Sequence, residues 1–192
     1  MSRSLNPTAN HARFSGAQRL LHWTMAAGIV AMLFIGVGML STVAPSYVPL
    51  AATHKTLGVA LFLLVLVRLC LRLVLGAPPL PASLPTMMRL GAVLSHWALY
   101  GLMIAMPLLG WAMMSAAGYP VVLFGHVQLP PILPQADWLH TLLWAAHRWL
   151  AFAFFALILL HVAAALFHAL VRRDGVFEAM SPLAASKTAP ER

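Results

Sequence analysis

Long apolar stretches alternate with short polar or proline-rich connections along the chain. Four stretches are long enough to cross a bilayer core, which takes about 20 apolar residues in a helix. A chain in lipid must satisfy its own backbone hydrogen bonds, so each stretch is expected to be an α-helix. The pattern therefore predicts four spans, at about residues 17–40, 52–75, 88–117 and 138–172.

The segments around these spans complete the predicted organisation. Residues 1–15 form a polar N-terminal segment, and residues 16–175 form one four-helix membrane domain. Residues 176–192 form a cytoplasmic tail whose end is expected to be disordered. The longest connection, residues 118–135, is apolar for a loop, which favours a position on or in the membrane surface.

Composition supports an all-α membrane protein and excludes an ordinary soluble domain. Hydrophobic residues make up 61% and charged residues 8%, against roughly 25% charged in soluble proteins. The net charge of +8 could suit nucleic acid, but the basic residues flank the spans rather than cluster. We therefore expect no nucleic-acid partner. Cys70 is the only cysteine, which excludes an internal disulfide and a cysteine-ligated iron–sulfur cluster.

The basic residues also predict how the chain is oriented. With four spans, both termini lie on one side of the membrane, and that side carries all the Lys and Arg residues except Lys55 and Arg148. Basic residues concentrate on the cytoplasmic side, so a four-transmembrane-helix bundle with both termini cytoplasmic is predicted. The residues on that side are Arg3, Arg13, Arg19, Arg68, Arg72, Arg89, Arg172, Arg173, Lys187 and Arg192.

The last span carries four histidines at seven-residue spacing, His140, His147, His161 and His168, with Phe154 in the one missing slot. Seven residues are nearly two helical turns, so all four lie along one face of one helix. A histidine stripe inside a membrane is costly without a partner. We hypothesise that two of these residues bind heme iron.

Depth in the membrane separates the four. A helix over residues 138–172 is roughly 52 Å long, whereas the apolar core is about 30 Å thick. If the excess is shared evenly, His140 and His168 fall in the interfaces, and His147 and His161 fall just inside the core. The last two are roughly 21 Å apart along the helix, which leaves room for two separate hemes.

Two further histidines match these depths. His22 is near the cytoplasmic end of the first span, at the depth of His161, and His54 opens the second span on the opposite side, at the depth of His147. The predicted pairs are therefore His22 with His161 and His54 with His147. A neutral imidazole offers one lone pair to a metal, and two of them fill both axial positions of an iron. The spans lack carboxylates, which argues against a zinc or di-iron site and, less strongly, against a proton pump.

The remaining histidines and the basic residues have a simpler interpretation. Histidines near a membrane interface usually act as polar anchors or hydrogen-bond other helices, which is what we expect of His11, His126, His140 and His168. Basic residues near span ends usually set topology. A second interpretation assigns some of these side chains to heme propionates or to a quinone. The candidates for such contacts are Arg19, Lys55, Arg68, Arg72, Arg89, His96 and Arg148.

Several short motifs resemble those of a known family. In chain order they are RLLHW, THKTLG, LVRLCLRL, APPLP, LSHWALYGLMIAMPLLGWAMM and HRWLAFAFFALILLHVAAALFHAL. In this order and spacing they resemble the prokaryotic cytochrome b561 family of small four-helix membrane cytochromes b. The resemblance covers roughly residues 14–182.

The resemblance implies two non-covalent b-type hemes in a multi-pass protein of the bacterial inner membrane. Carried over by motif, their ligands are His22 with His161 and His54 with His147, the same pairs that depth predicts. The family is associated with electron transfer to or from quinone and with superoxide oxidation. The expected partners are membrane lipid, quinone, and superoxide or a redox partner protein.

Several alternatives stay open at this point. The chain could act as an electron-transfer protein or as an oxidoreductase on quinone or superoxide. It could also be a cytochrome b membrane-anchor subunit of a dehydrogenase or hydrogenase. A histidine-containing transporter is a third alternative, from a different class of protein.

Overall fold

Four long helices dominate the computed structural model, which describes residues 13–41 and 45–182. Each helix is long and apolar enough to cross a membrane, so the predicted all-α four-helix membrane fold is confirmed. Predictions for residues 1–12, His11 among them, and for the end of the tail lie outside the described residues. The four helices are α1 (Gly16–Ser41), α2 (Tyr47–Leu75), α3 (Thr86–Ala116) and α4 (Asp137–Phe167).

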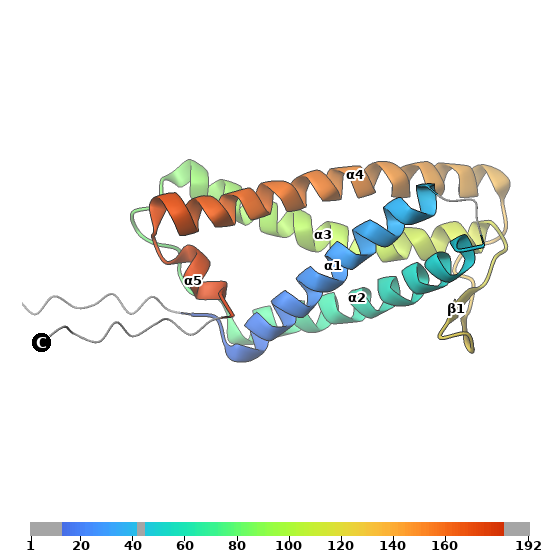
Figure 1. Ribbon diagram of the computed structural model, residues 1–192, viewed down its shortest axis with the longest axis horizontal. Coiled ribbons are helices and arrows are strands. Elements are labelled where there is room, and N and C mark those ends of the chain that lie inside the picture. The colour runs from blue at the N-terminus through green and yellow to red at the C-terminus, as the bar shows by residue number, and fades with distance from the viewer. Residues whose placement is uncertain (1–12, 42–44, 183–192) are drawn as a thin grey trace, which may run out of the picture.

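The helices form a bundle along the long axis of the molecule (Figure 1). Helix α1 packs closely on α2, and α3 packs closely on α4, whereas α2 and α3 contact each other less. The bundle is therefore two helix pairs laid side by side. Helix α4 belongs to one pair, and α1 and α2 form the other.

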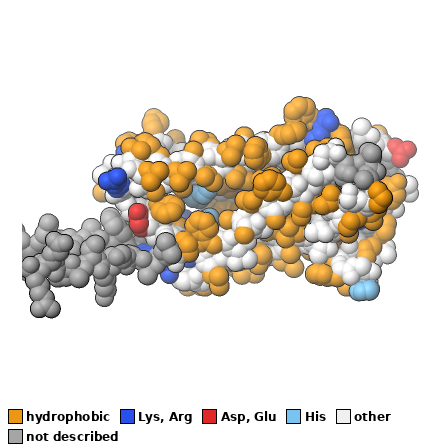
Figure 2. Space-filling view, in the orientation of Figure 1, with side chains coloured by type: hydrophobic (Ala, Val, Ile, Leu, Met, Phe, Trp, Pro, Cys, Tyr) orange, Lys and Arg blue, Asp and Glu red, His pale blue; other side chains and the backbone are white. Residues whose placement is uncertain are grey.

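The surface of the bundle is apolar. Figure 2 shows hydrophobic side chains over most of the visible face, with charged side chains toward its two ends. Large side chains such as Phe34 and Val74 are 74% and 81% exposed on the helices, which suits contact with lipid rather than water. The buried apolar residues include Met25 on α1, Val65 on α2 and Phe154 on α4.

Helix α1 begins with a reciprocal cap. The backbone N–H of Ser15 donates to Oε1 of Gln18 at 3.1 Å, and the backbone N–H of Gln18 donates to Oγ of Ser15 at 3.3 Å. This is the capping box of a Ser-x-x-Gln sequence. Nε2 of Gln18 also donates to the Gly76 carbonyl at 3.0 Å, so the start of α1 is tied to the end of α2.

Helix α2 begins at Tyr47, about five residues before the predicted position. The sequence pattern assigned Pro49 to the preceding loop because proline interrupts helices. Pro49 lies in the first turn of α2, where a backbone N–H has no helical acceptor and its loss costs nothing.

The connection between α3 and α4 contains a short antiparallel hairpin, β1 (Val121–Leu123) and β2 (Val127–Leu129). Strand β1 packs on α2 and, to a smaller extent, on α3. The sequence pattern predicts only an apolar connection here, so the hairpin is an addition to the predicted fold.

The C-terminal part of α4 departs from a simple span. Helix α4 ends at Phe167, and a π-helical turn, η1 (His168–Arg172), follows it. Arg173 and Gly175 then adopt left-handed conformations, and a short helix, α5 (Val176–Met180), folds back toward α1. Residues 173–181 are here called the C-terminal strap. The backbone N–H of Phe14, just before α1, donates to the Ala179 carbonyl at 3.1 Å, and Nε1 of Trp23 on α1 donates to the Met180 carbonyl at 2.9 Å. These hydrogen bonds hold the strap to the start of α1.

Candidate functional site

The structure brings the four predicted histidines together in two pairs. The ring centroids of His22 on α1 and His161 on α4 are 6.4 Å apart, with ring planes at 67°. Those of His54 on α2 and His147 on α4 are 6.3 Å apart, with ring planes at 65°. Both pairs join the α1–α2 half of the bundle to α4. We call them the inner pair (His22, His161) and the outer pair (His54, His147), after the predicted orientation.

The outer pair has ring nitrogens without partners. Nδ1 of His54 and Nδ1 of His147 are buried and make no hydrogen bond of good geometry within the described residues, although the Met106 backbone lies beside the His147 ring. Glycines face both rings: a Cβ on Gly110 would lie 3.5 Å from Cε1 of His147, and one on Gly36 would lie 4.0 Å from Cε1 of His54. A Cβ at either glycine would make ordinary van der Waals contact with the ring, so a larger side chain would compete with the ring for space.

The inner pair has a third histidine beside it. The ring of His96 on α3 lies 5.5 Å from the ring of His161, centroid to centroid. Nδ1 of His96 bonds the Ala92 carbonyl, so the proton lies on Nδ1 and Nε2 keeps its lone pair. Arg68 is near enough to act electrostatically on His22, His96 and His161.

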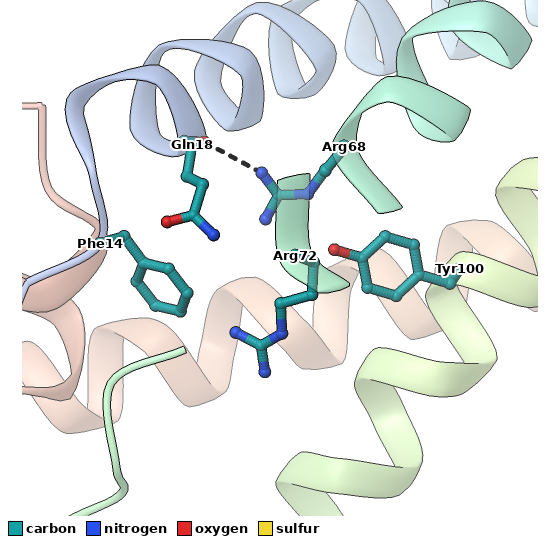
Figure 3. Close-up of a pocket in the computed structure, with 5 residues that line it drawn as sticks. All are labelled: Phe14, Gln18, Arg68, Arg72 and Tyr100. Atoms are coloured by element: carbon teal, nitrogen blue, oxygen red, sulfur yellow. Dashed lines mark hydrogen bonds between the residues drawn. The ribbon is translucent and has the colours of Figure 1, made fainter. Parts of the chain in front are cut away.

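A small pocket of basic and polar side chains lies at this end of the bundle (Figure 3). Arg68 donates from Nη1 to the Gln18 carbonyl at 3.1 Å, and the Arg72 guanidinium lies 5.4 Å from the centre of the Phe14 ring. Tyr100 approaches the two arginines from α3. The lining residues are Phe14, Gln18, Arg68, Arg72 and Tyr100. None of them is acidic, so the pocket suits an anionic ligand.

The other candidate contact residues lie in different surroundings. Nε of Arg19, three residues before His22, is buried and has no hydrogen-bond partner in the part of the chain that the structure describes. Arg89 is exposed and donates to the Pro81 carbonyl at 3.4 Å. Arg148 is exposed, with its guanidinium 4.7 Å and 5.5 Å from the ring centres of Trp144 and Trp149. Lys55 is half-buried beside His54.

His140 on α4 and His168 in η1, the other two histidines of the predicted last span, have partners within the chain. Nδ1 of His140 lies 3.1 Å from the Met113 carbonyl at the end of α3. Nδ1 of His168 lies 2.8 Å from Oδ2 of Asp174, which also accepts from Nε of Arg172 at 2.9 Å. Burial alone would raise the pKa of the Asp174 carboxyl, but the hydrogen bonds from Arg172 and His168 outweigh it and hold that pKa below 3.8, its ordinary value.

The residues present fit heme. Two imidazoles on opposite sides of one metal atom, each bonded at roughly 2 Å, have ring centres about 6 Å apart, close to the separation in both pairs. Among residues 13–41 and 45–182 no three His, Cys, Asp or Glu side chains could hold a bare ion together. A pair of histidines suits a group that supplies its own remaining ligands, as the porphyrin of a heme does.

Several residues around the pairs were not identified from the sequence. Gln18 is 6% exposed, and the only signal for it was the Ser-x-x-Gln spacing of the capping box. Gly36 and Gly110 are two of 12 glycines, and their spacing does not distinguish them from the others. Tyr100 lies one turn beyond His96, and no sequence signal marks it. The structure identifies it because it lines the same pocket as Arg68 and Arg72.

Several known proteins are similar to this chain in sequence. The model of the family described as prokaryotic cytochrome b561 matches residues 13–182. Cytochrome b561 homolog 2 of Escherichia coli (strain K12) is 30% identical over 171 residues, which is 88% of this chain and 90% of the relative. A Yersinia pestis protein named probable superoxide oxidase CybB is 30% identical over 175 residues, 90% and 97% of the two chains. Cytochrome b561 homolog 1 of Escherichia coli is 28% identical over 178 residues, 88% and 97% of the two chains.

Proposed function

The chain belongs to the prokaryotic cytochrome b561 family, a membrane cytochrome b family of electron carriers, and on this premise we propose that it moves electrons across the bacterial inner membrane through two b-type hemes. His22 and His161 hold one heme, and His54 and His147 hold the other. The observation that carries the proposal is the approach of the two ring pairs to 6.4 Å and 6.3 Å from separate helices.

A heme held by two of these histidines would supply one-electron transfer and would need no position for substrate at its iron. The protein's part is to keep both rings of each pair in place. Helix α4 supplies one ligand to each pair, so a single rigid element fixes the distance between the two hemes. Phe154, which is 9% exposed, lies on α4 halfway between His147 and His161.

The pocket at the inner end is proposed to bind the propionate carboxylates of the inner heme. Arg68 acts electrostatically on both histidines of the inner pair, and its neighbour Arg72 lines the same pocket. Guanidinium groups bind carboxylates by charge-assisted hydrogen bonds. Arg19, with its buried and unpartnered Nε, is proposed as a further contact.

Quinone is the proposed electron acceptor, at the cytoplasmic end, with His96 and Arg89 as candidate contacts. Superoxide is the proposed donor, at the other face, and the name of the Yersinia pestis relative supports this choice. In that reaction two superoxide ions each lose one electron and leave as O₂. One quinone takes the two electrons and two protons and becomes a quinol.

The test uses the purified full-length chain in phospholipid vesicles that contain ubiquinone. Superoxide is generated outside the vesicles, and the heme absorbance and the quinol formed are followed together. We expect the hemes to be reduced and then reoxidised by ubiquinone, with quinol accumulating. Turnover by the lone chain would also count against a membrane-anchor role.

The control for this experiment is a second histidine on α4. His147→Ala should abolish quinol formation because it removes a proposed ligand. His140→Ala, seven residues away on the same helix, should leave quinol formation near the wild-type rate. Equal loss in both variants, or heme that superoxide does not reduce in the wild type, would contradict the proposal.

A further inference from the structure

The turn of the β1–β2 hairpin carries a bulky residue in an unfavourable conformation. The backbone N–H of His126 donates to the Leu123 carbonyl at 3.0 Å, and the two residues between them, Phe124 and Gly125, have φ of 50° and 75°. Turns with two left-handed central residues prefer Asn and Gly. A phenylalanine at such a position is a conformational outlier that needs compensation.

The described residues do not provide that compensation. The Phe124 side chain is 75% exposed, and Val127, across the turn, is 54% exposed. By contrast, Val121 and Leu123 are 5% and 8% exposed, where the hairpin packs on the helices. The hairpin is therefore anchored at its base, and its tip exposes the apolar Phe124 and Val127 beside the uncharged His126 and Gln128.

The connection that carries the hairpin is also without charge. Residues 118–136 contain no Lys, Arg, Asp or Glu. A connection in water normally presents polar and charged side chains, and large exposed apolar surfaces mark a site of contact with lipid or with another protein. The hydrogen-bonded pairing of the two strands satisfies their facing backbone groups, a condition for any segment placed near lipid.

The hairpin lies beside the bundle, not beyond it. Figure 1 shows it at the level where α2 begins and α3 ends, projecting sideways from the long axis. Large apolar residues are exposed at the same end of the bundle: Val48 at the start of α2 is 71% exposed, and Trp138 at the start of α4 is 70% exposed. Aromatic residues at span ends lie at the membrane–water interface. The apolar tip thus continues the lipid-facing surface of the helices.

We propose that the hairpin is an interfacial membrane anchor, with Phe124 inserted among the phospholipids at this face of the bilayer. The occupant of the apolar tip is lipid because the tip is uncharged, projects sideways at the level of the span ends and is continuous with the lipid-facing helices. Burial of the Phe124 ring in lipid offsets the unfavourable backbone at the turn. This inference does not depend on the heme or quinone proposals.

Site-directed spin labelling tests the position of the tip. A nitroxide is attached to His126→Cys in a Cys70→Ser background, and the full-length protein is placed in phospholipid nanodiscs. Power saturation then measures collisions with O₂, which concentrates in lipid, and with a water-soluble nickel chelate. A label at Asp137→Cys, the exposed first residue of α4, reports a water-facing site at the same end. An unchanged helical circular dichroism spectrum in every variant verifies that each has folded.

We expect O₂ to dominate at position 126 and the nickel chelate to dominate at position 137. Adding Phe124→Asn should move the label at 126 into water, to the level at 137. Asparagine suits this turn better than phenylalanine, so a purely structural role for Phe124 predicts no such change. The proposal would be overturned if the nickel chelate dominated at position 126 in the parent protein, or if Phe124→Asn had no effect. It would also be overturned if neither reagent reached the label, which would indicate a covering protein.

Discussion

Four of the described histidines differ in whether Nδ1 has a hydrogen-bond partner. His140 and His168 have partners within the chain, the Met113 carbonyl and the Asp174 carboxylate. The Nδ1 atoms of His54 and His147 are buried and have no hydrogen bond of good geometry among the described residues. A buried polar atom without a partner is costly, so these two rings gain the most from a bound group that gives their nitrogens a partner.

Gly110 provides a test of the outer pair at the scale of one residue. A Cβ at this position would lie 3.5 Å from Cε1 of His147, and the two further methyl groups of valine would need space that the ring occupies. Gly110→Val should therefore displace His147 and reduce the heme content by about one per chain. The measurement is the ratio of heme to protein in the purified variant.

Gly101→Val is the matched control, because it is on the same helix and has no neighbouring atom within 4 Å of its added Cβ. The two variants carry the same cost in helix propensity. Equal heme content in Gly110→Val and Gly101→Val would show that crowding at His147 does not affect binding.

The sequence could identify the histidine pairs but not their surroundings. The length of the last span against the bilayer core separated His147 and His161 from their neighbours, and depth matched His22 and His54 to them. That matching rests on one dimension, the membrane normal. The rotation and the crossing angles of the helices decide which glycine faces a ring and whether His96 approaches His161. Hydropathy carries no information about helix rotation or crossing angles. The ligand assignment itself stays a prediction.

At the scale of elements, the C-terminal strap is held by a small ion cluster. Asp174 accepts from His168 and Arg172, and the strap that follows bonds to the start of α1 through its backbone carbonyls. The π-helical turn η1 precedes the strap, and it positions the His168 and Arg172 side chains so that both contact the Asp174 carboxylate. Such turns are rare and recur at functional sites. The strap closes the end of the bundle at which the inner pair lies.

Replacing this carboxylate should loosen the strap. Asp174→Asn should lower the free energy of unfolding by about 1–2 kcal/mol, because it weakens two charge-assisted hydrogen bonds at a partly buried site. The folded-state pKa of Asp174 is below its ordinary value. The stabilisation is therefore present above about pH 3.8 and is lost as the pH falls through the lowered pKa.

Thermal unfolding of the wild type and Asp174→Asn at several pH values measures this contribution. The gap between the two melting temperatures should be present at pH 5 and shrink as the pH falls below about 4. Glu178→Gln, at an exposed acid in the same strap, should leave the melting temperature unchanged. A gap that persists in strong acid would mean that the charge of Asp174 contributes nothing.

Element boundaries show what hydropathy can and cannot predict. The four spans were predictable because runs of about 20 apolar residues have one stable form in lipid. The start of α2 at Tyr47 was missed because Pro49, an interior helix breaker, is harmless in a first turn. The hairpin was missed because its turn uses Phe124 and Gly125, where the usual sequence signal is Asn-Gly.

At the scale of the whole molecule, charge sets the predicted orientation. Lys55 and Arg148 are the only basic residues on the predicted outer side, and the other ten of the 12 Lys and Arg are on the predicted cytoplasmic side. A green fluorescent protein fused to the C-terminus should therefore fluoresce, because it folds in the cytoplasm. Alkaline phosphatase fused at the same place should be inactive. An active phosphatase and a dark fluorescent protein would reverse the orientation, and with it the names of the inner and outer pairs.

Heme content per chain is the measurement that bears most directly on the central claim. The purified wild-type protein should contain two b-type hemes, and single alanine substitutions of His22, His54, His147 and His161 should each leave about one. His168→Ala and His140→Ala should keep both, since their rings have other partners. One heme per wild-type chain, or full heme content in His161→Ala with a loss in His168→Ala, would contradict the two histidine pairs.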